Sequence, residues 1–221
     1  MILSTKWIGA TGLAIALIAL DGCSGRIRYP SYYALSVPAP PATTGSASAG
    51  GANPILGSVA VREFSAPESL RSGKIVYRQS PVEVDFYDYH RWADDPRRVV
   101  TAAMVRQMQA RGLFQSVDLF DGRGSPECLL TGSLDHLEEV DQGAEVSIEV
   151  GVSARLIDLR TGAVLWHSAA SKTTRLDRRS VPGIVAEMSR GLGSAVEELV
   201  SSMQDRLSAS ASAPSGSHIE R

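Results

Sequence analysis

The chain has few cysteines and little excess charge of either sign. Only Cys23 and Cys128 occur among its 221 residues, so the fold has no disulfide framework to depend on and must be stabilised by an apolar core. With 22 basic and 24 acidic residues, the formal net charge is −2. This balance gives no bulk electrostatic attraction toward nucleic acid or anionic lipid. We therefore expect no nucleic-acid partner.

Common enzyme signatures are also missing. The chain has no Gly-x-Ser-x-Gly stretch for a nucleophile elbow, and Gly122-Arg123-Gly124 lacks the lysine and the helix of a phosphate-binding loop. Two histidines have acidic neighbours, but their spacing matches no known metal-ligand set: His90 lies among Asp85, Asp88, Asp94 and Asp95, and His136 lies beside Asp135, Glu138 and Glu139. We interpret them as a strand running into a helix cap and as a strand end. The sequence predicts no catalytic residue, no metal and no cofactor.

An apolar run from Trp7 to Leu20 follows Lys6 at the amino terminus. A short basic start, an apolar middle and a small residue before the cleavage site are typical of a secretory signal peptide. The run is shorter than the roughly 20 residues that a membrane-spanning helix needs. We therefore predict a signal peptide over residues 1–22.

The residues at the end of this signal resemble the lipobox of bacterial lipoproteins, in which a cysteine thiol is acylated and becomes the new amino terminus. Leu20, Gly22 and Cys23 fit that pattern, whereas Asp21 departs from it. An ordinary signal peptide or a short anchor that happens to hold a cysteine is the alternative. Ser24 after the cysteine, in place of Asp, implies by resemblance to Gram-negative lipoproteins a lipid-anchored protein of the outer membrane facing the periplasm. Acylation of Cys23 would supply about 0.8 kcal/mol per buried methylene.

Composition divides the rest of the chain. Residues 38–54 and 208–221 contain mainly Pro, Ala, Gly, Ser and Thr and almost no bulky apolar side chain. Such segments cannot offset the entropy lost on ordering, so we predict a flexible loop over 38–54 and a disordered tail over 208–221. The remainder of 23–207 is long enough for one domain with its own core. Within it Cys128 is expected to be a small buried hydrophobe, with a reactive thiol as the alternative.

Alternating apolar residues predict a sheet. The expected strands cover residues 32–37, 56–64, 75–78, 82–87, 113–120, 128–140, 144–159 and 163–169. The last two are joined by the turn from Asp158 to Gly162, which predicts an antiparallel hairpin.

Two segments have helical periodicity. The first begins at Pro96 with Asp95 as its cap and ends at Gly112. The second runs from about 181 to 207, with Ser180 as its cap and an apolar stripe along one side. Gly191 and Gly193 would each weaken an isolated helix by about 1 kcal/mol, so we expect this helix to pack closely on a surface. The predicted fold class is α+β, with a single mixed, mostly antiparallel sheet and two helices packed on one face.

Three stretches together carry a family resemblance. They are Tyr32-Tyr33-Ala34-Leu35 behind the anchor, the segment from Tyr77 to Pro96, and the segment from Leu156 to Trp166. Together they resemble the ABC-type transport auxiliary lipoprotein family, which includes the paraquat-inducible protein C lipoproteins. The resemblance covers residues from about 32 to 207.

Members of that family are non-catalytic partners of systems that pair an ABC transporter with a mammalian-cell-entry (MCE) protein. Those systems move phospholipids or other apolar molecules between the inner and outer membranes. The resemblance implies a docking role here, with MCE-domain and ABC transporter subunits as partners, a membrane contact through the lipid anchor, and several copies of this chain in a ring. The alternatives are a carrier that itself encloses a lipid or another apolar ligand, and an envelope hydrolase.

The segment from Tyr77 to Pro96 is the most specific of the three stretches, and aromatic residues gather in it. Alternation sends Tyr77 and Phe86 inward, and packing of the whole group in the core is one interpretation. The competing hypothesis is that Tyr87, Tyr89 and Trp92 form an exposed surface for a partner or a lipid, because interfaces are rich in Tyr and Trp.

Overall fold

A 14-residue strand, β6 (Cys128–Asp141), organises the sheet. One edge of β6 pairs with β7 (Val146–Asp158), and β7 pairs with β8 (Val164–Arg175), both antiparallel. The other edge is shared by two short strands that run parallel to it: β2 (Leu56–Val61) beside its start and β3 (Lys74–Ser80) beside its end. The computed structural model describes residues 28–38, 55–143 and 145–212.

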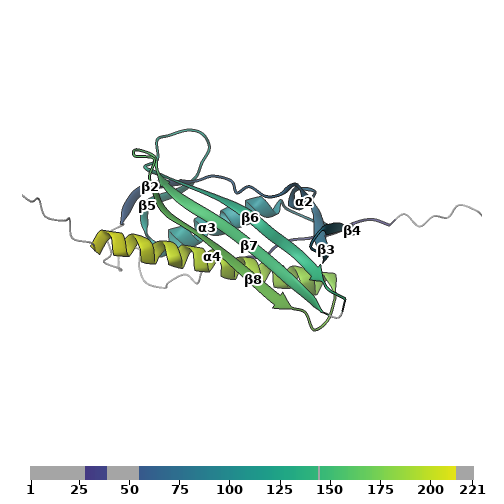
Figure 1. The fold of residues 1–221 in the computed structure, drawn as a ribbon. Coiled ribbons are helices and arrows are strands. Elements are labelled where there is room, and N and C mark those ends of the chain that lie inside the picture. The colour runs from purple at the N-terminus through teal and green to yellow at the C-terminus, as the bar shows by residue number, and fades with distance from the viewer. Residues whose placement is uncertain (1–27, 39–54, 144, 213–221) are drawn as a thin grey trace, which may run out of the picture.

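The short strands extend the sheet at two separate places. Strand β5 (Phe114–Leu119) pairs parallel with β2, whereas β4 (Glu83–Trp92) pairs antiparallel with β3, and β1 (Ser31–Tyr33) pairs parallel with β4. Figure 1 shows β2 and β5 at one end of the molecule and β3 and β4 at the other. At about 3.3 Å per residue, β6 separates these two ends by roughly 40 Å.

The predicted α+β fold with one mixed sheet is confirmed. Helices α3 (Pro96–Arg111) and α4 (Val181–Ser212) are the two predicted ones, and a single-turn helix, α2 (Glu68–Arg71), was not predicted. The extensive pairings of β6, β7 and β8 are antiparallel, as expected, while β1, β2 and β5 make only parallel pairings. Among the described residues, no helix has both the length and the apolar character needed to cross a membrane.

Both predicted helix starts and the glycine stop are confirmed. The Asp95 carboxylate accepts a hydrogen bond from the Arg97 backbone N–H at 2.9 Å, and the Arg97 side chain beside it lowers the pKa of Asp95. Helix α3 ends at Gly112, which has the left-handed φ of 63° that favours glycine. At the start of α4, the Ser180 hydroxyl accepts from the Gly183 N–H.

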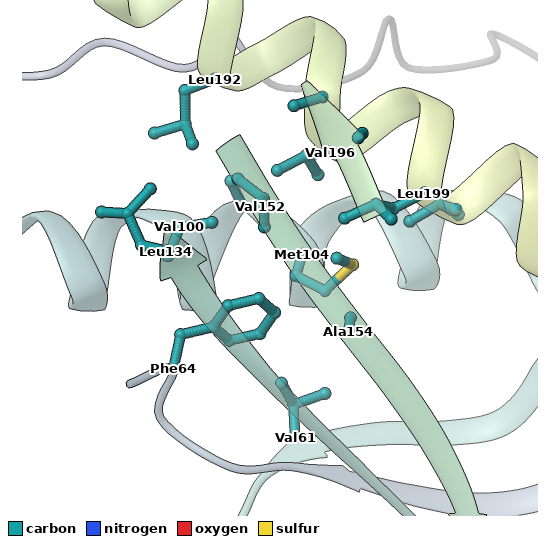
Figure 2. Packing of buried hydrophobic residues seen from close by; sticks show 14 of the residues in the cluster. Val61, Phe64, Val100, Met104, Leu134, Val152, Ala154, Leu192, Val196 and Leu199 are labelled. Atoms are coloured by element: carbon teal, nitrogen blue, oxygen red, sulfur yellow. The ribbon is translucent and has the colours of Figure 1, made fainter. Parts of the chain in front are cut away.

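The core lies between the sheet and helices α3 and α4. Figure 2 shows side chains from all three layers meeting there: Leu134, Val152 and Ala154 from the sheet, Val100 and Met104 from α3, and Leu192, Val196 and Leu199 from α4. Phe64, which follows β2, also enters this core. Cys128 is buried, as predicted, and burial raises the pKa of its thiol.

Several elements end at other residues than predicted. Strand β4 runs to Trp92 instead of 87, β8 runs to Arg175 instead of 169, and β2 ends at Val61 instead of 64. Helix α4 continues to Ser212, so the disordered tail predicted from residue 208 is wrong for 208–212. Alanine and serine there extend the helix past the last buried residue, Leu207, and the Ser210 hydroxyl donates to the Arg206 carbonyl one turn earlier. The strand predicted over 32–37 ends at Tyr33. The signal peptide, Cys23, residues 39–54 of the predicted loop and residues 213–221 lie outside the described residues.

Gly191 allows α4 to lie close to the sheet. A Cβ atom at Gly191 would be 2.9 Å from Cγ2 of Val150 on β7, inside normal contact distance, whereas a Cβ at Gly193 would meet its nearest neighbour, Val37 Cγ1, at 3.7 Å. The predicted close packing is therefore confirmed at Gly191, and Gly193 has room for a methyl group.

The two glycines provide a matched pair of variants. Gly193→Ala should raise the free energy of unfolding by about 0.5–1 kcal/mol, because alanine favours the helix and fits. Gly191→Ala should lower it, since the methyl group forces α4 away from Val150. Urea unfolding followed by circular dichroism measures both. Equal stabilisation by the two variants would contradict the close approach.

Candidate functional site

A register shift in β4 divides its aromatic residues between two faces. The pairing with β3 passes from Val76–Phe86 to Lys74–Arg91, so β4 has more residues than β3 in this stretch. Such a bulge re-aims the side chains that follow it. Tyr87 lies partly buried against the core, whereas Tyr89 is 45% exposed.

Tyr87 belongs to a polar cluster at the β3–β4 end of the sheet. Its hydroxyl donates to Glu139 Oε2 at 2.7 Å, and the Glu139 side chain is fully buried. Arg179 pairs with two carboxylates of β6. Its Nη2 atom lies 2.5 Å from Glu139 Oε1, an ion pair that lacks hydrogen-bond geometry. Its Nη1 atom lies 2.7 Å from Asp141 Oδ2. Burial, followed by the hydrogen bond to Glu139, raises the pKa of Tyr87 to about 12. The phenol therefore stays protonated and holds β4 and the start of α4 to β6.

Aromatic rings surround this cluster. The Tyr87 ring lies 5.2 Å from the Tyr77 ring and 5.6 Å from the His90 ring, measured between centroids. His90 Nδ1 is 3.1 Å from the Tyr33 hydroxyl, and the Tyr77 hydroxyl donates to Asp85 at 2.7 Å. His90 and Asp85 therefore have separate tyrosine partners.

Trp92 is not part of an exposed surface. It is only 6% exposed, so its predicted exposure is wrong. Strand β4 continues through Trp92, whose backbone N–H donates to Gly73 O at 2.9 Å, and the strand directs the ring into the core. The indole N–H has no hydrogen-bond partner among the described residues. Of the three predicted interface residues, Tyr89 alone is substantially exposed, and Tyr87 is occupied by Glu139.

A second polar group lies on the opposite face of β6 and β7. His136, Glu138 and Glu149 bring potential ligand atoms within 4.8 Å of one another. Both oxygens of the buried Glu138 already accept from Arg78, each at 3.2 Å, and the His136 Nδ1 atom is 3.1 Å from Glu138 Oε1. The Arg78 guanidinium competes with any cation for the Glu138 carboxylate. Arg78 and Glu138 are therefore better described as a hydrogen-bonded ion pair than as part of a metal site. Sequence analysis noted Glu138 beside His136 but not its burial or its pairing with Arg78, because nothing in a strand pattern marks an acid that pairs with a neighbouring strand.

The sheet face that carries this group is hollowed in two places. One hollow of about 520 Å³ is lined mainly by small or hydroxyl-bearing residues of β6, β7 and β8, among them Thr131, Ser133, Ser153, Ser168 and Ala169. Another of about 720 Å³ lies between the β3–β4 turn and the β6–β7 turn, beside Arg78 and Glu149. Both hollows are open to solvent rather than enclosed, which suits contact with a partner surface better than enclosure of an apolar molecule.

We expect Glu139→Ala to lower the free energy of unfolding by about 2 kcal/mol, because it leaves the partly buried Tyr87 hydroxyl without its acceptor and Arg179 with Asp141 as its remaining ion-pair partner. Glu145→Ala is the control, since it removes the exposed ion pair of Glu145 with Arg175 and should change stability by less than about 0.5 kcal/mol. Chemical denaturation at neutral pH provides the comparison. Similar losses for both variants would show that the buried cluster adds little.

Trp92 is buried and Tyr89 is exposed, so truncating each side chain to alanine should change the stability of the domain by different amounts. Trp92→Ala should destabilise the domain by about 3–5 kcal/mol, because it removes a large buried ring, whereas Tyr89→Ala should change stability by less than about 0.5 kcal/mol. Thermal melting of the two variants tests the assignment. A strongly destabilised Tyr89→Ala protein would place Tyr89 in the core instead.

The comparisons with known proteins agree with this architecture. The fold resembles that of protein XCC0632 from Xanthomonas campestris, with a TM-score of 0.67 and 17% identity over 83% of this chain and all of that chain. A second solved structure, described only as an uncharacterized protein, has a TM-score of 0.59 and 13% identity over 78% of this chain and 97% of its own. At these identities the likeness is one of fold. No curated protein matches the chain.

The family is established by sequence. The family model described as the ABC-type transport auxiliary lipoprotein component matches residues 33–200. This range extends from the end of β1 into α4 and includes every element of the sheet beyond β1. Because the match covers well over half of the chain, the protein belongs to the family of ABC-type transport auxiliary lipoprotein components.

Proposed function

We propose that the protein is a non-catalytic accessory lipoprotein of an ABC transporter that works with an MCE protein, and that it serves phospholipid or apolar-molecule transport between the two membranes. A lipid on Cys23 holds it on the outer membrane, facing the periplasm. The family match carries this proposal, because it begins at residue 33, ten positions after the cysteine, and covers almost the whole folded domain.

The mechanism that we propose is positioning of partners. Residues from every layer fill the space between the sheet and the helices, and Leu134, Leu137, Ile148 and Met188 there are almost completely buried. The two hollows on the opposite face are open to solvent and enclose no cavity. A filled core and open outer hollows favour docking of transporter proteins over the alternative of a carrier that encloses a lipid. Further copies of the chain are among the proposed partners.

Acylation is tested at the predicted attachment residue. Cys23→Ser should lower the membrane-bound fraction of the protein, because the thiol that accepts the lipid is gone. The matched control is Cys128→Ser, which alters a buried thiol of the core and should leave the protein in membranes. Fractionation of cells, with mass spectrometry of the processed amino terminus, gives the readout. An unmodified Cys23 in the parent protein would refute the anchor.

The role itself is tested by extraction of the anchored protein in mild detergent. Co-purification of an MCE protein and ABC transporter subunits, without stoichiometric lipid, is the expected result. Recovery of the chain alone with one bound lipid would instead establish a carrier. Steady hydrolysis of an ester or phosphate substrate by the purified protein would establish an enzyme.

A further inference from the structure

Three tyrosines are exposed where the described chain begins. Tyr29 is 80% exposed and Tyr32 is 65% exposed, and Tyr89 on the neighbouring strand is also exposed. We call this region the outer tyrosine surface and define it by Arg28, Tyr29, Tyr32, Tyr89 and Arg91.

The strand register places Tyr32, Tyr89 and Arg91 together, and the segment that leads into β1 carries Arg28 and Tyr29. Tyr33 pairs with Trp92 and Tyr32 pairs with Arg91 in the β1–β4 ladder. Because Trp92 points into the core and neighbouring residues of a strand point to opposite faces, Tyr32 and Arg91 lie on the outer face. Tyr89 is two residues before Arg91 and shares that face.

Basic groups accompany the rings. The Arg28 guanidinium carbon lies 5.5 Å from the centre of the Tyr89 ring, in a cation–π contact. On the other side of β4, Lys74 pairs with Arg91 in the ladder with β3. Tyrosine rings settle at the headgroup level of a bilayer, and clustered arginine and lysine residues are attracted to anionic lipid headgroups. Arg28 and Arg91 give this surface two positive charges, although the exposed Asp88 adjoins Tyr89 and the net charge of the chain is −2.

The sequence sets this surface close to the proposed lipid. Arg28 follows Cys23 by five residues, and a chain of that length reaches at most about 18 Å when fully extended. The headgroup region on each side of a bilayer is itself roughly 6 Å thick. If the acyl chains enter the membrane, the outer tyrosine surface is thus within reach of the headgroups, while the β2–β5 end of β6 is not held to them.

We propose that the outer tyrosine surface lies on the headgroup region of an anionic bilayer. It gives the domain a second membrane contact beside the lipid on Cys23, and it fixes which end of the sheet faces the membrane. The reasoning on reach rests on the proposed acylation of Cys23. The contact itself depends only on the described residues and can be measured without acylation.

The test uses the chain from residue 23 onward with Cys23→Ser, mixed with vesicles of phosphatidylethanolamine with or without phosphatidylglycerol. Partition into sedimented vesicles that contain phosphatidylglycerol should fall about tenfold when Tyr29, Tyr32 and Tyr89 are all replaced by serine. The control replaces Leu119, Leu159 and Val164 by serine. These residues are comparably exposed but lie near β5 and the β7–β8 turn, so partition should be unchanged.

Equal partition of the parent and the tyrosine variant would overturn the proposal, as would a parent that does not sediment with either kind of vesicle. Retained vesicle binding together with lost co-purification of transporter proteins would assign the surface to a protein partner instead. Arg28→Glu provides a second variant in case the triple replacement disturbs folding, and it should weaken binding to anionic vesicles only. Because the protein in this assay has no acyl chain, its result is independent of mass spectrometry of Cys23, which tests the proposed anchor.

Discussion

Helix α4 lies along β7 and β8 and buries one side of its length against them. The buried side includes Ile184, Met188, Leu192, Val196, Leu199, Met203 and Leu207, and burying each large side chain contributes about 1.5–3 kcal/mol before conformational entropy is subtracted. Gly191 permits the short distance, because its neighbour Val150 occupies the space that a side chain would need. The sheet face under α4 is consequently committed to the core, which leaves the opposite face and the ends of the sheet accessible to other molecules.

The buried polar cluster couples this packing to the β3–β4 end of the sheet. Arg179 lies just before α4, and through Glu139 and Tyr87 it joins the start of the helix to β6 and β4. With Tyr87 held inward and Trp92 in the core, the bulge in β4 leaves Tyr89 on the outside. The surface proposed to meet lipid headgroups is thus positioned by residues that never touch lipid.

Sequence reasoning reached the family and the fold class because both rest on local signals. The Asp95–Pro96 cap, the glycine stop at Gly112 and the hairpin around Asp158 are each encoded within a few residues, and the structure contains all three. The candidate site was only partly predictable. Alternation through β4 carries no sign of the bulge, so the sequence left Trp92 open between the core and an exposed surface, and the pairing of Glu139 with Arg179 joins residues 40 positions apart.

The sequence by itself determined the element types, the apolar stripe of α4 and the family, because helix periodicity, strand alternation and capping act between near neighbours in the chain. Only the tertiary structure decided which edge of β6 receives β2 and β3, which face of β4 carries each aromatic ring, and which acids are buried with a cation. Those outcomes depend on parallel pairings and ion pairs between distant segments, whose register is set by packing against the whole core and leaves no local pattern.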